Sequence, residues 1–417
     1  MKSLKLLICI CLLISSIYGY SQDASAPAAT TTTAVTATTP AEEPTEAEDE
    51  NGEFAFSGYF DTYYFANLNK PASRNNLGAS GISRGFDRYV GQFQLGMLMA
   101  RMSYSYKSVE LVTEVGWGPN VEYGSYGNDF RYKWGTVIAN NTTTAVAIKQ
   151  AYVNVKPTDK LTLTLGQFGT HIGYELIDAP LNFHYSINNT FNAGIPFYHM
   201  GLKGTYAFSD KVSLMAGVVN GTDNYNDNNR GKSFIGQLFV SPVKGLSLYL
   251  NTIQGNEGNA LADGTDPESS YFGVLDFVAS YQISDRVLLA FWGMYGSAKG
   301  DFQGVDNGPD MLHWSGANLY VTYKFSDVFS LGTRLEHFDN EDGARGLKTN
   351  GLGTSANTYT LTGNFSIADG KLTLKPEVRL DDFDELGAGE PQQFMDEEGN
   401  FTKSSQTTVG MAAIFKF

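Results

Sequence analysis

The sequence predicts an all-β protein, an antiparallel transmembrane β-barrel of about 16 strands with short periplasmic turns and long external loops. Three observations predict it. From Phe54 to the end of the chain, segments of roughly ten residues alternate apolar and polar side chains, as barrel strands do. The connections between these segments alternate between short and long. Outside residues 1–22, no apolar run is long enough to cross a bilayer as a helix.

The alternation is clearest between Leu372 and Asp381. One face of this segment carries Leu, Pro and Val, and the other carries Thr, Lys, Glu, Arg and Asp. Side chains two residues apart point to the same side of a strand, so the two sets lie on opposite sides of the sheet. A dry core would not accept the polar set, because each unpaired buried polar group costs several kcal/mol. A water-filled lumen accepts it, while the apolar set faces lipid.

The expected strands cover 54–66, 91–105, 109–117, 145–156, 160–169, 197–208, 211–220, 232–241, 245–254, 271–283, 286–297, 314–325, 328–338, 356–367, 371–382 and 405–417. The long connections between them are 67–90, 118–144, 170–196, 221–231, 255–270, 298–313, 339–355 and 383–404. An even number of strands returns both termini to the same side, which we expect to be the periplasm. Two soluble β domains are the alternative interpretation, although they would have no reason to keep every long loop at one end.

The N-terminus has the pattern of a secretory signal peptide over residues 1–21. Lys2 and Lys5 precede an apolar stretch from Leu6 to Ile17, and small residues follow at the expected cleavage site. Both cysteines lie inside this segment, so the mature chain would have no disulfide and no thiol ligand. Residues 22–52 are rich in Ala, Thr, Pro and Glu and predict a disordered linker, and the barrel is expected over 53–417.

The formal net charge of −15 gives no electrostatic basis for binding nucleic acid. The five histidines are scattered, and the chain has no nucleophile elbow, zinc-protease motif or phosphate-binding loop, so we expect no enzyme activity and no cofactor. Acidic stretches at 223–227 and 306–310 offer oxygen ligands for calcium, but their spacing does not match a calcium loop. Solvated turns are the simpler interpretation, and no metal site is expected.

The chain stops at Phe417, at the end of an alternating strand. A terminal aromatic residue in this setting resembles the signal by which barrel-assembly machinery recognises outer-membrane proteins. Together with the signal peptide it predicts the outer membrane of a Gram-negative-type cell envelope. The expected partners are outer-membrane lipid, lipopolysaccharide and small hydrophilic solutes, and a homotrimer is compatible with the pattern.

Several stretches resemble one known family. They are GYFDTYY at 58–64, QAYVNV at 150–155, LGQFGT at 165–170, IGYE at 172–175, NFHYS at 182–186 and IPFYHMG at 195–201. The chain resembles the OmpL-like β-barrel porins of the Bacteroidetes type over about 54–417. This resemblance implies an outer-membrane pore and does not identify a solute.

Charged residues on the predicted lumen side of the strands are the candidate pore-lining groups. By strand parity they are Asp61, Glu110, Glu114, Lys203, Asp276, Arg334, Glu336, Lys375, Glu377, Arg379 and Asp381. Charged rings at a constriction set ion preference. The alternative is that these groups pair across strands and only solvate the wall.

The loop at 170–196 is the candidate constriction loop. It is long and unusually rich in apolar and aromatic residues, and by count it is the third external loop, the one that folds inward in general porins. Glu175, Asp178 and His184 would then face the channel. A loop packed on the rim or on a neighbouring subunit is the alternative.

The leading function is passive diffusion of small hydrophilic solutes or ions, because barrels of about sixteen strands leave an aqueous lumen. The alternative is a structural or adhesive outer-membrane barrel with a plugged lumen.

Overall fold

The computed structural model describes residues 52–81, 83–124, 146–224, 227, 229–258, 270–302, 305–306 and 308–417. The predicted signal peptide and the predicted linker up to residue 51 lie outside the described residues. None of the helices in the described part is long and apolar enough to cross a bilayer.

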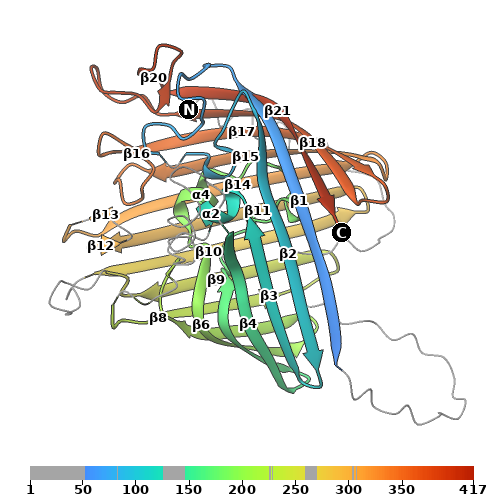
Figure 1. Cartoon of the computed structure of the whole chain (residues 1–417). Coiled ribbons are helices and arrows are strands. Elements are labelled where there is room, and N and C mark those ends of the chain that lie inside the picture. The colour runs from blue at the N-terminus through green and yellow to red at the C-terminus, as the bar shows by residue number, and fades with distance from the viewer. Residues whose placement is uncertain are drawn as a thin grey trace, which may run out of the picture.

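Sixteen long antiparallel strands form one closed sheet, which confirms the predicted fold class (Figure 1). Each strand pairs with the next along the chain, and the first pairs with the last between Tyr59–Asn67 and Thr408–Lys416, which closes the barrel. The strands are β1 (Glu53–Asn67), β2 (Phe93–Tyr106), β3 (Val109–Trp117), β4 (Val146–Thr158), β5 (Leu161–Gly169), β6 (Tyr198–Ser209), β7 (Val212–Val219), β8 (Ser233–Val240), β9 (Leu246–Gly255), β10 (Tyr271–Ser284), β11 (Val287–Lys299), β14 (Leu312–Lys324), β15 (Phe329–Asn340), β17 (Leu352–Ile367), β18 (Leu372–Phe383) and β21 (Ser405–Lys416).

The connections differ sharply between the two ends of the barrel. At one end, which we call the short-turn end, neighbouring strands join through a few residues, as between β2 and β3 or β10 and β11. At the other, the long-loop end, the loops carry short hairpins and helical turns. These are η1 (Gly85–Asp87), α2 (Pro119–Gly124), η2 (Ala179–Leu181), α4 (Asn189–Gly194), β12 (Asp301–Phe302), β13 (Val305–Asp306), β16 (Lys348–Thr349), β19 (Phe394–Met395) and β20 (Phe401–Lys403).

The predicted strand positions agree with the structure to within four residues at every end. The largest difference is at the start of β17, which begins at Leu352 and not at residue 356. Its first residues pair with the two-residue β16 in a hairpin above the barrel wall. This extension lies in a loop sequence without regular alternation, so the pattern did not predict it.

Side chains alternate between the outer and inner surfaces as predicted. On β17, Tyr359 and Leu361 are about half exposed on the outer surface, at 50% and 49%, whereas their neighbours Thr360 and Thr362 are buried inside. On the outer surface, exposed Phe, Leu, Val and Tyr recur on β1, β3, β6, β10 and β18. This band suits lipid, since only a closed barrel satisfies every strand hydrogen bond within a bilayer.

Loops from the long-loop end fold into the barrel. Helix α4 of the third loop (170–197) and helix α2 of the second contact the strands from within, and Figure 1 shows both inside the ring of strands. Phe86, Ile172 and Phe191 from three loop positions join wall residues such as Trp292 and Trp314 in one buried apolar cluster. The interior core of this protein is therefore built between loops and wall.

Candidate functional site

The third loop (170–197) crosses the barrel interior. It contains two short helical turns, η2 and α4, and the side chain of Asn188 caps α4 by accepting a hydrogen bond from the backbone N–H of Phe191 at 2.7 Å. Every residue from His184 to Tyr198 is buried. A loop with this apolar content packs against the nearest available surface, because exposure would cost about 25 cal/mol per Å² of apolar area.

Arg334 on β15 forms the central anchor of the loop. Its guanidinium contacts the Glu175 carboxylate at 2.6 Å and donates to the carbonyl oxygen of Ser186 at 2.6 Å. Glu175 also accepts from the backbone N–H of Asn188 at 2.8 Å. Burial raises the pKa of the Glu175 carboxyl, and the adjacent Arg334 charge opposes that rise. The pair holds two distant parts of the loop against one strand.

Glu336 lies two residues further along the same strand and also binds the loop. Its carboxylate accepts from the backbone N–H and the hydroxyl of Thr190, at 2.7 and 2.8 Å. The neighbouring Asn189 donates to the hydroxyl of Thr358 on β17 at 3.1 Å. The start of α4 is thus held by side chains from two adjacent strands.

Strand β18 supplies a row of alternating charges to the loop. Glu377 accepts from the backbone N–H of Tyr185 at 2.8 Å, and Arg379 donates to the carbonyl oxygen of Ile187 at 2.7 Å. Lys375 donates to the carbonyl oxygen of Ala179 at 2.9 Å. Alternate residues of the strand point inward, and each of these three binds a different stretch of the loop backbone.

Two further candidate residues bind the loop from other parts of the wall. Asp61 on β1 accepts from the hydroxyl of Tyr185 at 2.7 Å. Asp276 on β10 accepts from the backbone N–H of Gly173 at 3.3 Å and from the indole of Trp292. With the anchors on β15, β17 and β18, these contacts show that the third loop reaches opposite sides of the interior.

The structure places the three candidate residues of the loop itself in protein contacts. Glu175 and His184 are buried, and His184 shares a 2.7 Å hydrogen bond with the hydroxyl of Thr362. Burial lowers the pKa of the His184 imidazole well below its ordinary value, which keeps the ring neutral. Asp178 pairs with Lys149 on β4 and accepts from the hydroxyl of Tyr59 at 3.0 Å. All three attach the loop to the wall.

The remaining candidates lie on the wall formed by β3 to β6. Glu114 pairs with Arg101 at 2.6 Å and with Lys149 at 3.1 Å. Glu110 accepts from the amide of Asn154 at 2.8 Å. The ammonium of Lys203 lies 4.2 Å from the centre of the Phe168 ring. Within the described part of the chain, Lys203 forms no ion pair.

Sequence reasoning missed the part played by the first loop (68–92). Arg84 is fully buried, pairs with Asp87, and reaches Asp381 of β18 at 2.9 Å. Phe86 packs edge-on against Tyr123 of α2 and lies 5.6 Å from the Phe197 ring. The sequence feature that could have indicated this role is the oppositely charged pair Arg84 and Asp87 on either side of Gly85-Phe86 in an otherwise polar loop.

Asp381 joins the first loop and the third loop to one point on the wall. It binds Arg84 of the first loop and also the guanidinium of Arg379, at 2.7 Å, which in turn holds the third loop. Two cations satisfy this one carboxylate, as a fully buried charge requires.

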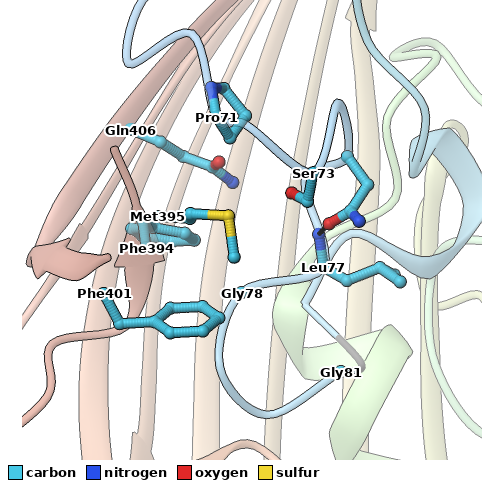
Figure 2. Close-up of a pocket in the computed structure, with 10 residues that line it drawn as sticks. Pro71, Ser73, Leu77, Gly78, Gly81, Phe394, Met395, Phe401 and Gln406 are labelled. Atoms are coloured by element: carbon cyan, nitrogen blue, oxygen red, sulfur yellow. Dashed lines mark hydrogen bonds between the residues drawn. The ribbon is translucent and has the colours of Figure 1, made fainter. Parts of the chain in front are cut away.

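A cavity of about 140 Å³ opens where the first loop meets the β19–β20 hairpin of the eighth loop (384–404). Figure 2 shows Phe401 and Met395 on one side of it and Ser73 and Leu77 on the other. It lies at the long-loop end, above the polar row of β18.

Of the two acidic stretches that offer oxygen ligands for calcium, 223–227 has an ordinary local role at its first residue. Asp223 accepts from the backbone N–H groups of Phe197 and Tyr198 at 2.6 and 3.1 Å. Residues 225, 226 and 307 of these stretches lie outside the described residues. Among the residues that the structure describes, no group of three His, Cys, Asp or Glu side chains could hold a metal ion.

The family model described as "Putative beta-barrel porin-2, OmpL-like" matches residues 53–417. The chain belongs to this porin family. This match confirms the family that the short stretches resemble. Members of the family are porin-type barrels of the outer membrane. No curated protein sequence matches the porin.

Solved structures of other outer-membrane proteins share the porin's fold at low sequence identity. The outer-membrane channel DcaP of Acinetobacter baumannii is 11% identical with a TM-score of 0.56, covering 89% of this chain and 99% of its own. The anion-selective porin from Comamonas acidovorans is 12% identical with a TM-score of 0.54, covering 88% and 100%. The trimer form of OmpT of Vibrio cholerae is 14% identical with a TM-score of 0.53, covering 88% and 100%.

Proposed function

We propose that this porin is a narrow, non-enzymatic channel for passive diffusion of small hydrophilic solutes or ions. The observation that carries the proposal is the third loop, which spans the interior and is held there by charged side chains of β1, β10, β15 and β18. A barrel of sixteen strands is wide enough for an aqueous lumen. A loop fixed across it narrows that lumen to the space between the loop and the wall.

Exposed inward-facing residues support an open vestibule in the half of the lumen toward the short-turn end. The inward-facing residues Glu53 and Ser57 at the start of β1 are exposed. Leu181, on the part of the third loop next to Lys375, is 58% exposed although it belongs to an interior segment. The Arg101 side chain on β2 is 36% exposed. Water therefore reaches the underside of the loop.

Single-channel recording of the purified porin in a planar bilayer tests the proposal. We expect discrete current steps smaller than an unobstructed sixteen-stranded barrel would give, because the third loop occupies part of the cross-section. Absence of any step above background would refute passive diffusion.

A plugged structural barrel is the second candidate, and one observation favours it. Toward the long-loop end, the inward-facing wall residues Ile235, Ile253 and Phe272 are all 0% exposed, because loop side chains cover them. If this packing closes the whole cross-section, conductance is absent while the barrel remains folded. The same bilayer recording separates the two candidates.

The even strand number supports periplasmic termini and an external long-loop end. Lipopolysaccharide and outer-membrane lipid would then surround the apolar band, and Phe417 would mark the last strand for the barrel-assembly machinery. The trimer form of one structural neighbour supports a homotrimer. A protease-cleavable tag at the C-terminus, tested for cleavage in intact and in permeabilised cells, decides the orientation. Cleavage in intact cells would contradict it.

A further inference from the structure

The cavity at the long-loop end has the features of a preformed binding pocket. Its two walls come from the first loop and from the eighth loop, far apart in the sequence. Backbone hydrogen bonds join these walls, from Ala79 N–H to the Gln393 carbonyl at 2.7 Å and from Ala72 N–H to the Asp396 carbonyl at 3.1 Å. Because these hydrogen bonds already hold the walls together, ligand binding would cost little conformational entropy for ordering the loops.

The pocket floor is also fixed. Gln406 is buried, accepts a hydrogen bond from the amide of Asn67 at 2.8 Å and donates to Asp381 at 3.3 Å. Asp381 is the carboxylate that binds Arg84 and Arg379. The floor thus rests on the ion-pair network that holds the two interior loops.

The chemistry of the lining excludes a charged ligand. The pocket is lined by Pro71, Ser73, Asn75, Leu77, Gly78, Gly81, Phe394, Met395, Phe401 and Gln406, and none of them is charged. A charge taken into such a site without a counter-ion would lose its hydration uncompensated. The ligand is therefore neutral.

The lining combines apolar surface with free hydrogen-bonding groups. Phe401 and Met395 lie on one side of the space in Figure 2, and Ser73 lies on the other. Within the described part of the chain, the Ser73 hydroxyl and the Asn75 side-chain NH₂ have no hydrogen-bond partner, whereas the Asn75 oxygen accepts from Leu77 N–H at 3.1 Å. The ligand accordingly has one apolar face and polar edges.

The size of the cavity limits the ligand to one ring. A volume of about 140 Å³ is close to the ~150 Å³ apolar cavity that holds one benzene molecule. A purely apolar ring would leave the Ser73 and Asn75 groups unpaired, which costs binding energy. A pyranose ring has C–H groups that pack against an aromatic face and hydroxyl groups around its edge.

We propose that this pocket binds a single pyranose unit of a neutral sugar at the mouth of the porin. The ring packs on Phe401, and its hydroxyl groups bind Ser73 and Asn75. Binding here requires only the two loops and does not require passage through the barrel, so the site goes beyond the proposed diffusion function.

The test is saturation-transfer NMR on the full-length folded porin in a detergent without a sugar headgroup. The probe is methyl α-D-glucopyranoside, with gluconate as a charged probe of similar size. We expect a saturable signal from the glucoside and none from gluconate. No signal from the glucoside, or an equal signal from both probes, would overturn the proposal.

Variants identify the binding place. Phe401→Ala should weaken glucoside binding about tenfold or more, corresponding to about 1.4 kcal/mol. Ser73→Trp should abolish binding by filling the pocket, since Ser73 is an exposed residue whose replacement leaves the barrel intact. Phe93→Ala is the matched control, because Phe93 is an 84% exposed aromatic of the barrel outside the pocket. Unchanged binding in Ser73→Trp would place the sugar elsewhere and overturn the proposal.

Discussion

The charged residues on two arcs of the inner wall have different surroundings. On the arc from β15 to β18, the charged residues Arg334, Glu336 and Glu377 are buried and bound to the third loop. On the arc from β5 to β9, the loop meets apolar residues such as Ile235 and Ile253, and Lys203 keeps a charge with no ion pair in the described part of the chain. The first arc uses its charges to hold the loop, and the second carries a partly buried positive charge that no described carboxylate neutralises.

This difference shows why a count of lumen charges is a poor guide to selectivity. A buried ion pair has lost its hydration, and its two charges largely cancel for a passing ion. The field of a wall charge that has no counter-charge is not cancelled within the lumen, and charged groups at a constriction set ion preference. The loop-facing arc should therefore govern structure and opening, and the Lys203 arc should govern selectivity.

The largest expected effect follows from removing the loop. Replacing residues 174–190 by a short Gly/Ser linker takes away the contacts made by Glu175, Tyr185 and Thr190 and leaves the strands intact. We expect a clear rise in single-channel conductance with normal barrel assembly, checked by heat-modifiable gel migration. Unchanged conductance in an assembled barrel would show that the loop does not narrow the pathway.

The next largest effect should come from Arg334→Met on the loop-facing arc. The substitution leaves Glu175 buried without its partner, which costs roughly 3–5 kcal/mol. We expect a lower temperature for loss of the folded gel band and noisier channel currents.

Arg101→Met is the matched control for that substitution, since the Arg101 side chain is 36% exposed and its partner Glu114 keeps Lys149. Because Glu114 keeps Lys149 as a counter-charge, we expect a smaller loss of stability than for Arg334→Met. The double variant Arg334→Met/Glu175→Gln should recover part of the stability lost in Arg334→Met, because it also removes the buried Glu175 charge that would lack a partner. Equal destabilisation by the two single Arg variants would contradict the distinction between the arcs.

Measurements of ion selectivity test the role of Lys203 on the arc from β5 to β9. The acidic chain, together with Glu110, an inward carboxylate that forms no ion pair in the described part of the chain, predicts a mild cation preference that Lys203 opposes. The preference is measured as the zero-current potential across a KCl gradient. Lys203→Glu should strengthen that preference, because it reverses a positive charge on the inner wall that no described carboxylate neutralises. Lys160→Glu, an equal charge change at the exposed β4–β5 turn, should have less effect. Anion preference in the unchanged porin would refute the prediction.

The smallest effect is expected from the N-terminal segment. Deleting residues 23–50 should leave assembly and conductance unchanged, since this segment has no aromatic residue with which to join either arc. Heat-modifiable migration of the deletion variant checks the expectation. Loss of the folded band would show that the linker takes part in assembly.

Local pattern determined the wall of this protein. Alternation with a period of two sets which side chains of a strand share a face, so strand positions, strand number and the inward parity of residues such as Arg334 and Glu377 follow from short stretches of sequence. The turn residues between them set the strict alternation of short and long connections. The family resemblance rests on equally local stretches.

Tertiary structure alone decided what the inward charges do. Arg84 pairs with Asp381, 297 residues away along the chain, and Arg334 pairs with Glu175, 159 residues away. No local periodicity encodes such partners, because they depend on where a loop lies once the barrel has closed. The same holds for the first loop, whose polar sequence gave little sign of its buried Arg84. It holds also for Lys203, because only the assembled strands show that none of the described carboxylates pairs with it.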